Sequence, residues 1–167
     1  TWRDGWRHLR FILLMAPHVV FAIPGWLFTA FFGMMTLALS LGPMAIARME
    51  LDYHHLFYSV PLFAIGIQLL WFDLFAGKFK AFVGLSSKQD IKPFSLDKFL
   101  LLGCGLLVFA ITIFLFVLIG WINSGKEALF AIRECSLALT LFLVGFLVII
   151  NALIVSMFEL HFDSRKE

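Results

Sequence analysis

The chain has 167 residues, of which 62% are hydrophobic and 14% are charged, and its mean hydropathy is +0.97. A soluble domain is about 45 to 50% apolar and ~25% charged, so this composition excludes an ordinary soluble enzyme. The formal net charge of +2 does not indicate nucleic-acid binding, and no Pro/Gly/Ser-rich linker divides residues 1–167 into more than one domain.

Residues 1–16 predict an amphipathic helix that Pro17 ends. Its apolar stripe consists of Trp2, Trp6, Leu9 and Leu13. Its cationic stripe consists of Arg3, Arg7 and Arg10. Such a helix lies flat on a membrane, with its indoles as interfacial anchors and its guanidinium groups against lipid phosphates. Two interpretations stay open: a general anchor held by anionic lipid, or a docking surface for one phosphate-bearing lipid.

Four long apolar stretches predict transmembrane helices at residues 24–41, 55–77, 99–122 and 135–158. A hydrocarbon core ~30 Å thick needs about 20 apolar residues at 1.5 Å rise each, close to the length of each stretch. Pro24 suits the opening of the first span, and Trp71 lies near a span end, where interfacial aromatic residues gather. We therefore expect an all-α membrane protein, with an N-terminal interfacial helix followed by four transmembrane helices.

Two amides and one carboxylate lie inside the predicted spans. Gln68 and Asn151 are deep enough to require hydrogen-bond partners, and we expect either a bond between them or contact with a substrate lipid. Asp73 is about one turn from its span end, with Lys78 and Lys80 just beyond, which favours a local ion pair. The alternative hypothesis is that these three residues and the arginine stripe frame a polar entrance for a lipid phosphate.

Asp52, His54 and His55 lie together before the second span. Adjacent histidines on a helix point about 100° apart, so the spacing is poor for a metal ion, and we predict no metal site in this chain. Asp52 suits a helix cap instead. The two cysteines are too far apart along the spans for a disulfide, and we interpret both as small apolar fillers.

The basic residues predict the orientation. With both termini in the cytoplasm, ten Lys and Arg residues lie on the cytoplasmic side and three on the other, as the positive-inside bias requires. An even number of spans also places both termini on one side. The absence of an initiator Met before Thr1 predicts a fragment, or a processed piece, of a longer polypeptide.

Several blocks of the sequence resemble those of a known family of membrane enzymes. They are RDGWRHLRFILL at residues 3–14, Pro24-Gly25, LDYHHLFYSVPLFAIGIQLLWFDLFAGKF at residues 51–79, and more weakly Gly145 and Ser156. Together they resemble the membrane region that follows the catalytic domain in bacterial family-2 glycosyltransferases of the polyprenyl-phosphate (dolichol-phosphate-like) type. The third span adds nothing to this resemblance.

The resemblance implies a parent enzyme whose N-terminal domain transfers a hexose from a nucleotide sugar to a membrane polyprenyl phosphate, with a divalent metal. That domain is not in this sequence, which carries no Asp-x-Asp motif, so no catalytic residue and no cofactor are assigned to this chain. The resemblance implies a module of the bacterial inner membrane that anchors the enzyme and orients its lipid acceptor. Its expected partners are membrane lipids, including polyprenyl phosphate, and either copies of itself or other membrane subunits.

The alternative function is a non-catalytic integral subunit that packs within a larger membrane complex through its phenylalanine-rich helices. A transporter or channel is disfavoured, because the spans lack paired intramembrane charges and broken midplane helices.

Overall fold

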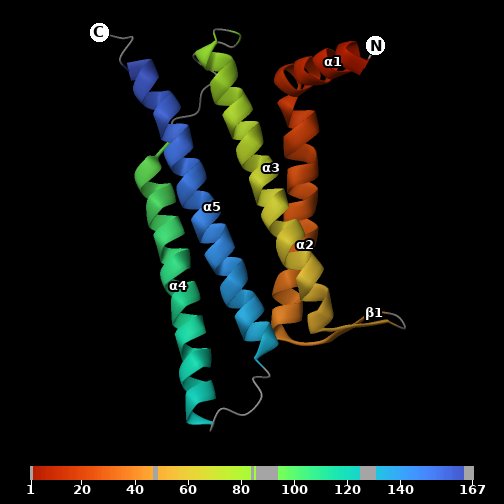
Figure 1. The fold of residues 1–167 in the computed structure, drawn as a ribbon, viewed down its shortest axis with the longest axis vertical. Helices are drawn as coiled ribbons and strands as arrows, with labels where there is room; N and C mark the ends of the chain where they lie inside the picture. Colours follow the sequence, from red (N-terminus) through yellow and green to blue (C-terminus); the bar gives the residue numbers. More distant parts are fainter. Residues whose placement is uncertain (1, 47–48, 84, 86–93, 125–130, 164–167) are drawn as a thin grey trace.

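The computed structural model describes residues 2–46, 49–83, 85, 94–124 and 131–163 (Figure 1). Its α-helices are α1 (Trp2–Met15), α2 (Ile23–Leu41), α3 (Leu56–Phe82), α4 (Leu96–Asn123) and α5 (Ile132–Asp163). Its shorter elements are a π-helix η1 (His18–Ala22), a 3-10 turn η2 (Tyr53–His55), and antiparallel strands β1 (Met44–Ile46) and β2 (Met49–Leu51). The predicted fold class, a short N-terminal helix and four apolar helices, is confirmed.

Four helical segments are long and apolar enough to cross a bilayer: His18–Leu41, Tyr53–Ala81, Leu96–Asn123 and Ile132–Met157. Each segment overlaps one predicted span and begins a few residues before the predicted start of that span. In their most apolar windows only 11% to 39% of the residues are buried within the chain. Most of their surface is therefore apolar and turned outward, as an integral membrane protein requires.

The helical segment of the first candidate span begins at His18, six residues before the predicted start of the span at Pro24. Helix α1 ends just before Pro17, as predicted, but residues 18–22 are already helical. In this π-helix the amide of Ile23 donates to the carbonyl of His18, five residues back. Pro24 has no N–H to donate. Because the wider turn shifts the bonding pattern directly before the proline, the helix passes through it without a break.

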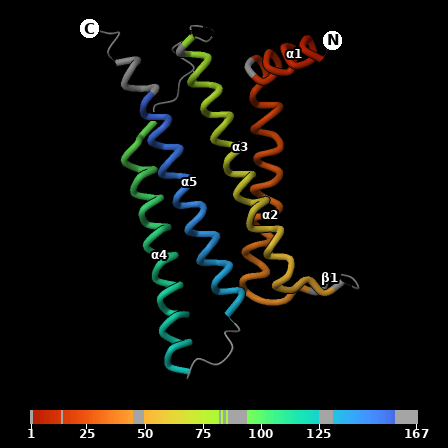
Figure 2. The backbone as a smooth tube through the Cα atoms, in the orientation of Figure 1, coloured from red at the N-terminus to blue at the C-terminus, as the bar shows by residue number. Residues whose placement is uncertain are grey.

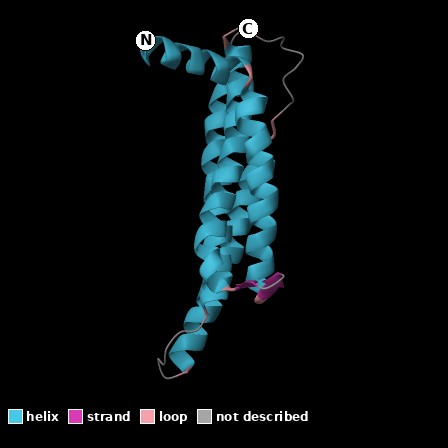
Figure 3. Cartoon of the chain, turned by 90° about the vertical axis from the view of Figure 1, so that its right-hand side faces the viewer, coloured by secondary structure: helices cyan, strands magenta, loops and turns pink. Residues whose placement is uncertain are grey.

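The four spans lie side by side in the order α4, α5, α3, α2, as the ribbon and the tube show (Figures 1 and 2). Seen from the side, they overlap in one narrow slab (Figure 3). The most extensive contacts are between α4 and α5 and between α2 and α3, and α3 packs on α5 to join the two pairs. The start of α1 and the end of α5 lie at one end of the spans, here called the α1 end, and the β1–β2 hairpin lies at the other, the hairpin end.

Glycines set the close approach within each helix pair. A Cβ atom built on Gly66 of α3 would lie 2.6 Å from the backbone nitrogen of Thr29 in α2. One built on Gly145 of α5 would lie 2.9 Å from the carbonyl oxygen of Gly103 in α4. Lipid tails are as apolar as leucine, so membrane helices associate through close van der Waals packing of this kind.

The core lies toward the α1 end and contains Trp71 of α3 with Val148, Ala152 and Val155 of α5. The indole of Trp71 is 7% exposed and packs against the ring of Phe99, with 5.4 Å between centroids. The predicted interfacial role of Trp71 is therefore wrong: Trp71 lies ten residues before the end of the span at Ala81, and α3 turns its side chain into the helix bundle.

Candidate functional site

Helix α1 presents aromatic and basic side chains to the outside. The side chains of Arg3, Arg7 and Arg10 are all exposed, and Trp2 is 88% exposed. The guanidinium carbon of Arg10 lies 5.4 Å from the Trp6 ring centroid, so the two stripes touch along their shared border. Helix α1 lies crosswise to the spans at their end and projects outward from them (Figures 1 and 3). This is the geometry of a helix lying on a surface that the spans penetrate.

Lys80 fastens the end of α1 to α3. Its ammonium donates to the backbone carbonyl of Met15, at 2.8 Å. The last carbonyls of a helix have no partner within the helix, and a lysine is a suitable donor for them. Sequence reasoning placed Lys80 near the lipid phosphate but gave no sign of this contact, which joins residues 65 positions apart.

Asp73 makes a second connection below α1. Its Oδ1 lies 2.8 Å from Nδ1 of His18, in the π-helix that opens the first span. The side chain of Asp73 is 18% exposed and that of His18 is 81% exposed. The partner that the structure gives Asp73 is this histidine of η1, which the sequence did not indicate.

Lys78 is buried beside an aromatic ring that precedes α4. It is only 3% exposed, and its ammonium lies 5.9 Å from the ring centroid of Phe94, which also packs on Trp71 and Phe99. Residues two apart on a helix are about 200° apart, so Lys78 and Lys80 cannot line one entrance. The proposed polar frame divides accordingly: Asp73 and Lys80 belong to the α1 side, and Lys78 belongs to the α4 side.

Gln68 and Asn151 form the hydrogen bond that the sequence suggested. The Gln68 amide nitrogen donates to Asn151 Oδ1 at 3.2 Å, and the Asn151 amide nitrogen donates to Gln68 Oε1 at 2.9 Å. Asn151 is 2% exposed and also donates to the carbonyl of Leu147 in its own helix. The pair joins α3 to α5 within the spans.

At the hairpin end, Asp52 caps the turn η2, accepting a hydrogen bond from the backbone nitrogen of Tyr53 at 2.7 Å. Its Oδ1 also accepts a hydrogen bond from the guanidinium of Arg133, at the start of α5, and the two charged groups form an ion pair. The Arg133 hydrogen bond, and then the Tyr53 amide, hold the pKa of the Asp52 carboxyl below its ordinary value. The cap was predicted, but Arg133, 81 residues away, was missed, and no sequence signal connects the two residues.

No group of three or more His, Cys, Asp or Glu residues suited to a metal ion occurs in the part of the chain that the structure describes. The basic residues at 48, 88, 92, 126, 165 and 166, which contribute to the predicted orientation, lie outside that part.

Four apolar spans and a transverse basic helix define an integral membrane protein. One comparison bears on its family: residues 87–159, less than half of the chain, match the glycosyltransferase family 2 C-terminal transmembrane region. This segment of the chain is therefore similar to the membrane region of family 2 glycosyltransferases. No curated protein and no solved structure matches the chain significantly.

The family that the sequence resemblance indicated is thus confirmed, but through different residues. The matched segment contains α4 and most of α5, whereas the resemblance rested mainly on residues 3–14 and 51–79. The third span, which contributes nothing to the resemblance, is part of the match.

Proposed function

We propose that this chain is the membrane-anchoring and acceptor-orienting module of a polyprenyl-phosphate glycosyltransferase. The family 2 transmembrane region supports the parent enzyme class. The role of the module is proximity: it holds the phosphate of a lipid acceptor near a catalytic domain at the α1 end, and it performs no bond chemistry itself.

The exposed arginine stripe on a fixed helix carries this proposal. Guanidinium groups bind phosphate oxygens in bidentate geometry and keep their charge at any physiological pH. The stripe is held near the ends of the spans because Lys80 bonds the last turn of α1 and Asp73 contacts the residue that opens the first span. A helix fixed in this way loses less freedom when it binds a ligand than a free one would.

The orientation belongs to the same proposal. The excess of basic residues at the α1 end supports a cytoplasmic position for that end in a bacterial inner membrane. Reporter fusions at the two ends of the full-length protein should both report cytoplasm, and reports from opposite compartments would contradict this orientation.

The alternative function, a non-catalytic subunit of a larger membrane complex, would use the outward apolar surface of the spans for protein contacts. Lipid accounts for that surface equally well, and the family match on α4 and α5 favours the glycosyltransferase module.

The test replaces Arg3, Arg7 and Arg10 together, in the full-length enzyme. Two variants separate a general anchor from a phosphate site: all three arginines to Gln, which removes charge and geometry, and all three to Lys, which keeps the charge. General attraction to anionic lipid contributes about 1 kcal/mol per basic residue and survives in the Lys variant. Bidentate contacts do not survive, so we expect the KM for the polyprenyl phosphate to rise about tenfold or more in both variants, for a loss of ~1.4 kcal/mol.

Membrane recovery of each variant is the control for anchoring. Wild-type kinetics in the Lys variant would mean that the arginines act only as a general anchor to anionic lipid. Unchanged kinetics in the Gln variant would contradict any role of the three arginines in acceptor binding. Lys80→Met supplies a second measurement, because it should raise the same KM by releasing α1 while leaving all three arginines in place.

A further inference from the structure

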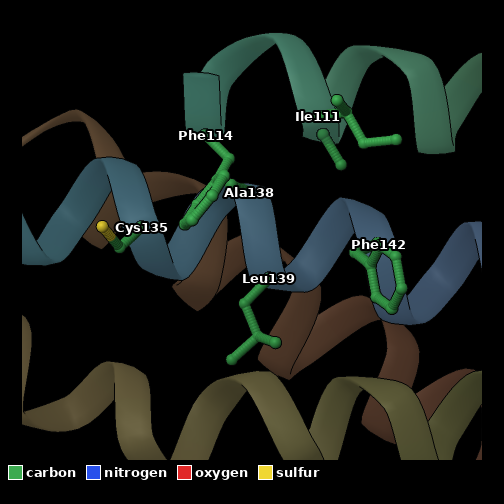
Figure 4. Close-up of a pocket in the computed structure, with 7 residues that line it drawn as sticks. Ile111, Phe114, Cys135, Ala138, Leu139 and Phe142 are labelled. Atoms are coloured by element: carbon green, nitrogen blue, oxygen red, sulfur yellow. The ribbon is translucent and has the colours of Figure 1, made fainter. Parts of the chain in front are cut away.

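A groove of about 330 Å³ lies between α4 and α5, from the middle of α4 to the first turns of α5. Figure 4 shows side chains of both helices that line it. We call it the α4–α5 groove. It is lined by Ala110, Ile111 and Phe114 of α4 and by Cys135, Ala138, Leu139 and Phe142 of α5. The two alanines are buried, whereas the two phenylalanines and Leu139 are about half exposed. Short side chains therefore make the hollow, and larger ones make its rim.

The groove is closed on one side and open on the other. Toward the α1 end, the Gly103–Gly145 crossing brings the two backbones together and leaves no room between them. Toward the hairpin end the two helices spread apart (Figure 1). On α5 the lining extends from Cys135 to Phe142, which at 1.5 Å per residue is roughly 10 Å of depth. One leaflet supplies about 15 Å of hydrocarbon, half of a ~30 Å core.

We propose that the α4–α5 groove binds one acyl chain of a phospholipid from the leaflet at the hairpin end. Its lining offers hydrocarbon contacts throughout, and an apolar cavity of ~150 Å³, about half this volume, already takes up a guest as large as benzene. A lipid tail anchored at the α1 end would meet the closed side of the groove, so the geometry favours a chain that enters from the opposite leaflet.

Recognition in this site is of the chain rather than of the headgroup. Arg133, the basic residue of α5 at this end, bonds to Asp52 and is held by it. Residues two apart on a helix are about 200° apart, so Arg133 and the groove residue Cys135 point in opposite directions. This lipid site is independent of the proposed acceptor site, which lies at the other end of the spans.

Photolabelling of the full-length protein tests the proposal. The protein is placed in vesicles of phosphatidylethanolamine and phosphatidylglycerol that contain a trace of phosphatidylcholine with a diazirine on its acyl chain. Peptide mapping should find stronger labelling at residues 110–114 and 135–142 than at Leu101 and Phe116, two of the most exposed residues of α4. A phosphatidylglycerol probe with the same chain should give the same pattern.

Ala138→Leu fills the groove and should abolish this excess labelling. Leu153→Phe is the matched control, because it adds bulk at an exposed position of the same helix and should leave the excess unchanged. Cys135→Leu, at the end of the lining nearest the start of α5, gives the same test should Ala138→Leu fail to fold.

Three results would overturn the proposal. Labelling no stronger than at the two exposed α4 residues would mean contact with bulk lipid only. Excess labelling that both groove-filling variants leave intact would place the chain elsewhere. Crosslinks from the groove to peptides of a second copy of the chain, obtained with a protein-reactive crosslinker, would mean that protein rather than lipid occupies it.

Discussion

The reciprocal amide pair of Gln68 and Asn151 should couple α3 to α5 by a measurable free energy. The two side chains exchange two hydrogen bonds, at 3.2 and 2.9 Å. Interhelical hydrogen bonds in membrane proteins average about 0.6 kcal/mol each and reach about 1.7 kcal/mol. Two such bonds predict a coupling free energy of about 1 to 3 kcal/mol between the two positions.

A double-mutant cycle measures this coupling. Gln68→Leu, Asn151→Leu and the double variant are compared with the wild type by equilibrium unfolding of the full-length protein in lipid micelles. The double variant should lose less stability than the sum of the single losses, because each single variant leaves one amide without its interhelical partner. A coupling below about 0.3 kcal/mol, where independent sites add, would refute this reasoning. Unchanged acceptor kinetics in a folded double variant would identify the pair as structural rather than as a substrate contact.

Two further predictions concern packing and charge. Gly66→Ala should lower the free energy of unfolding by about 1 to 3 kcal/mol, because the new methyl group meets the backbone of α2, whereas Gly77→Ala, with open space around it, should not destabilise α3. Equal losses of stability in the two variants would contradict the close crossing. The lowered pKa of Asp52 means that its pairing stabilises the fold above pH 3.8, its ordinary value, and that this contribution is lost as the pH falls through the lowered pKa. Arg133→Gln should return the Asp52 pKa toward 3.8 in an NMR titration, and an unmoved pKa would show that Arg133 is not its cause.

The sequence by itself determined where the chain crosses the membrane and how the first helix is built. Hydropathy is a property of each local segment, so four stretches of about 20 apolar residues identify four spans whatever their neighbours. The two stripes of α1 follow equally from helical spacing. The Gln68–Asn151 bond could also be foreseen, since two amides at similar depth in hydrocarbon each need a partner and few others are present at that depth.

Only the tertiary structure decided how each span is rotated about its axis. A helix that is apolar on all sides carries no stripe to show which side faces another helix and which faces lipid. Trp71 and Lys78 therefore proved to be buried, which the sequence did not predict.

For the same reason, the sequence did not predict the side-chain contacts at the two ends of the spans. Asp73 meets His18, Lys80 meets the end of α1, and Asp52 meets Arg133, each across helices whose rotation and neighbours the sequence left open. The groove between α4 and α5, next to the level at which Gly103 and Gly145 bring these helices together, likewise could not be predicted from the sequence. Depth in the bilayer is encoded locally, whereas the facing of side chains results from packing between segments far apart in the chain.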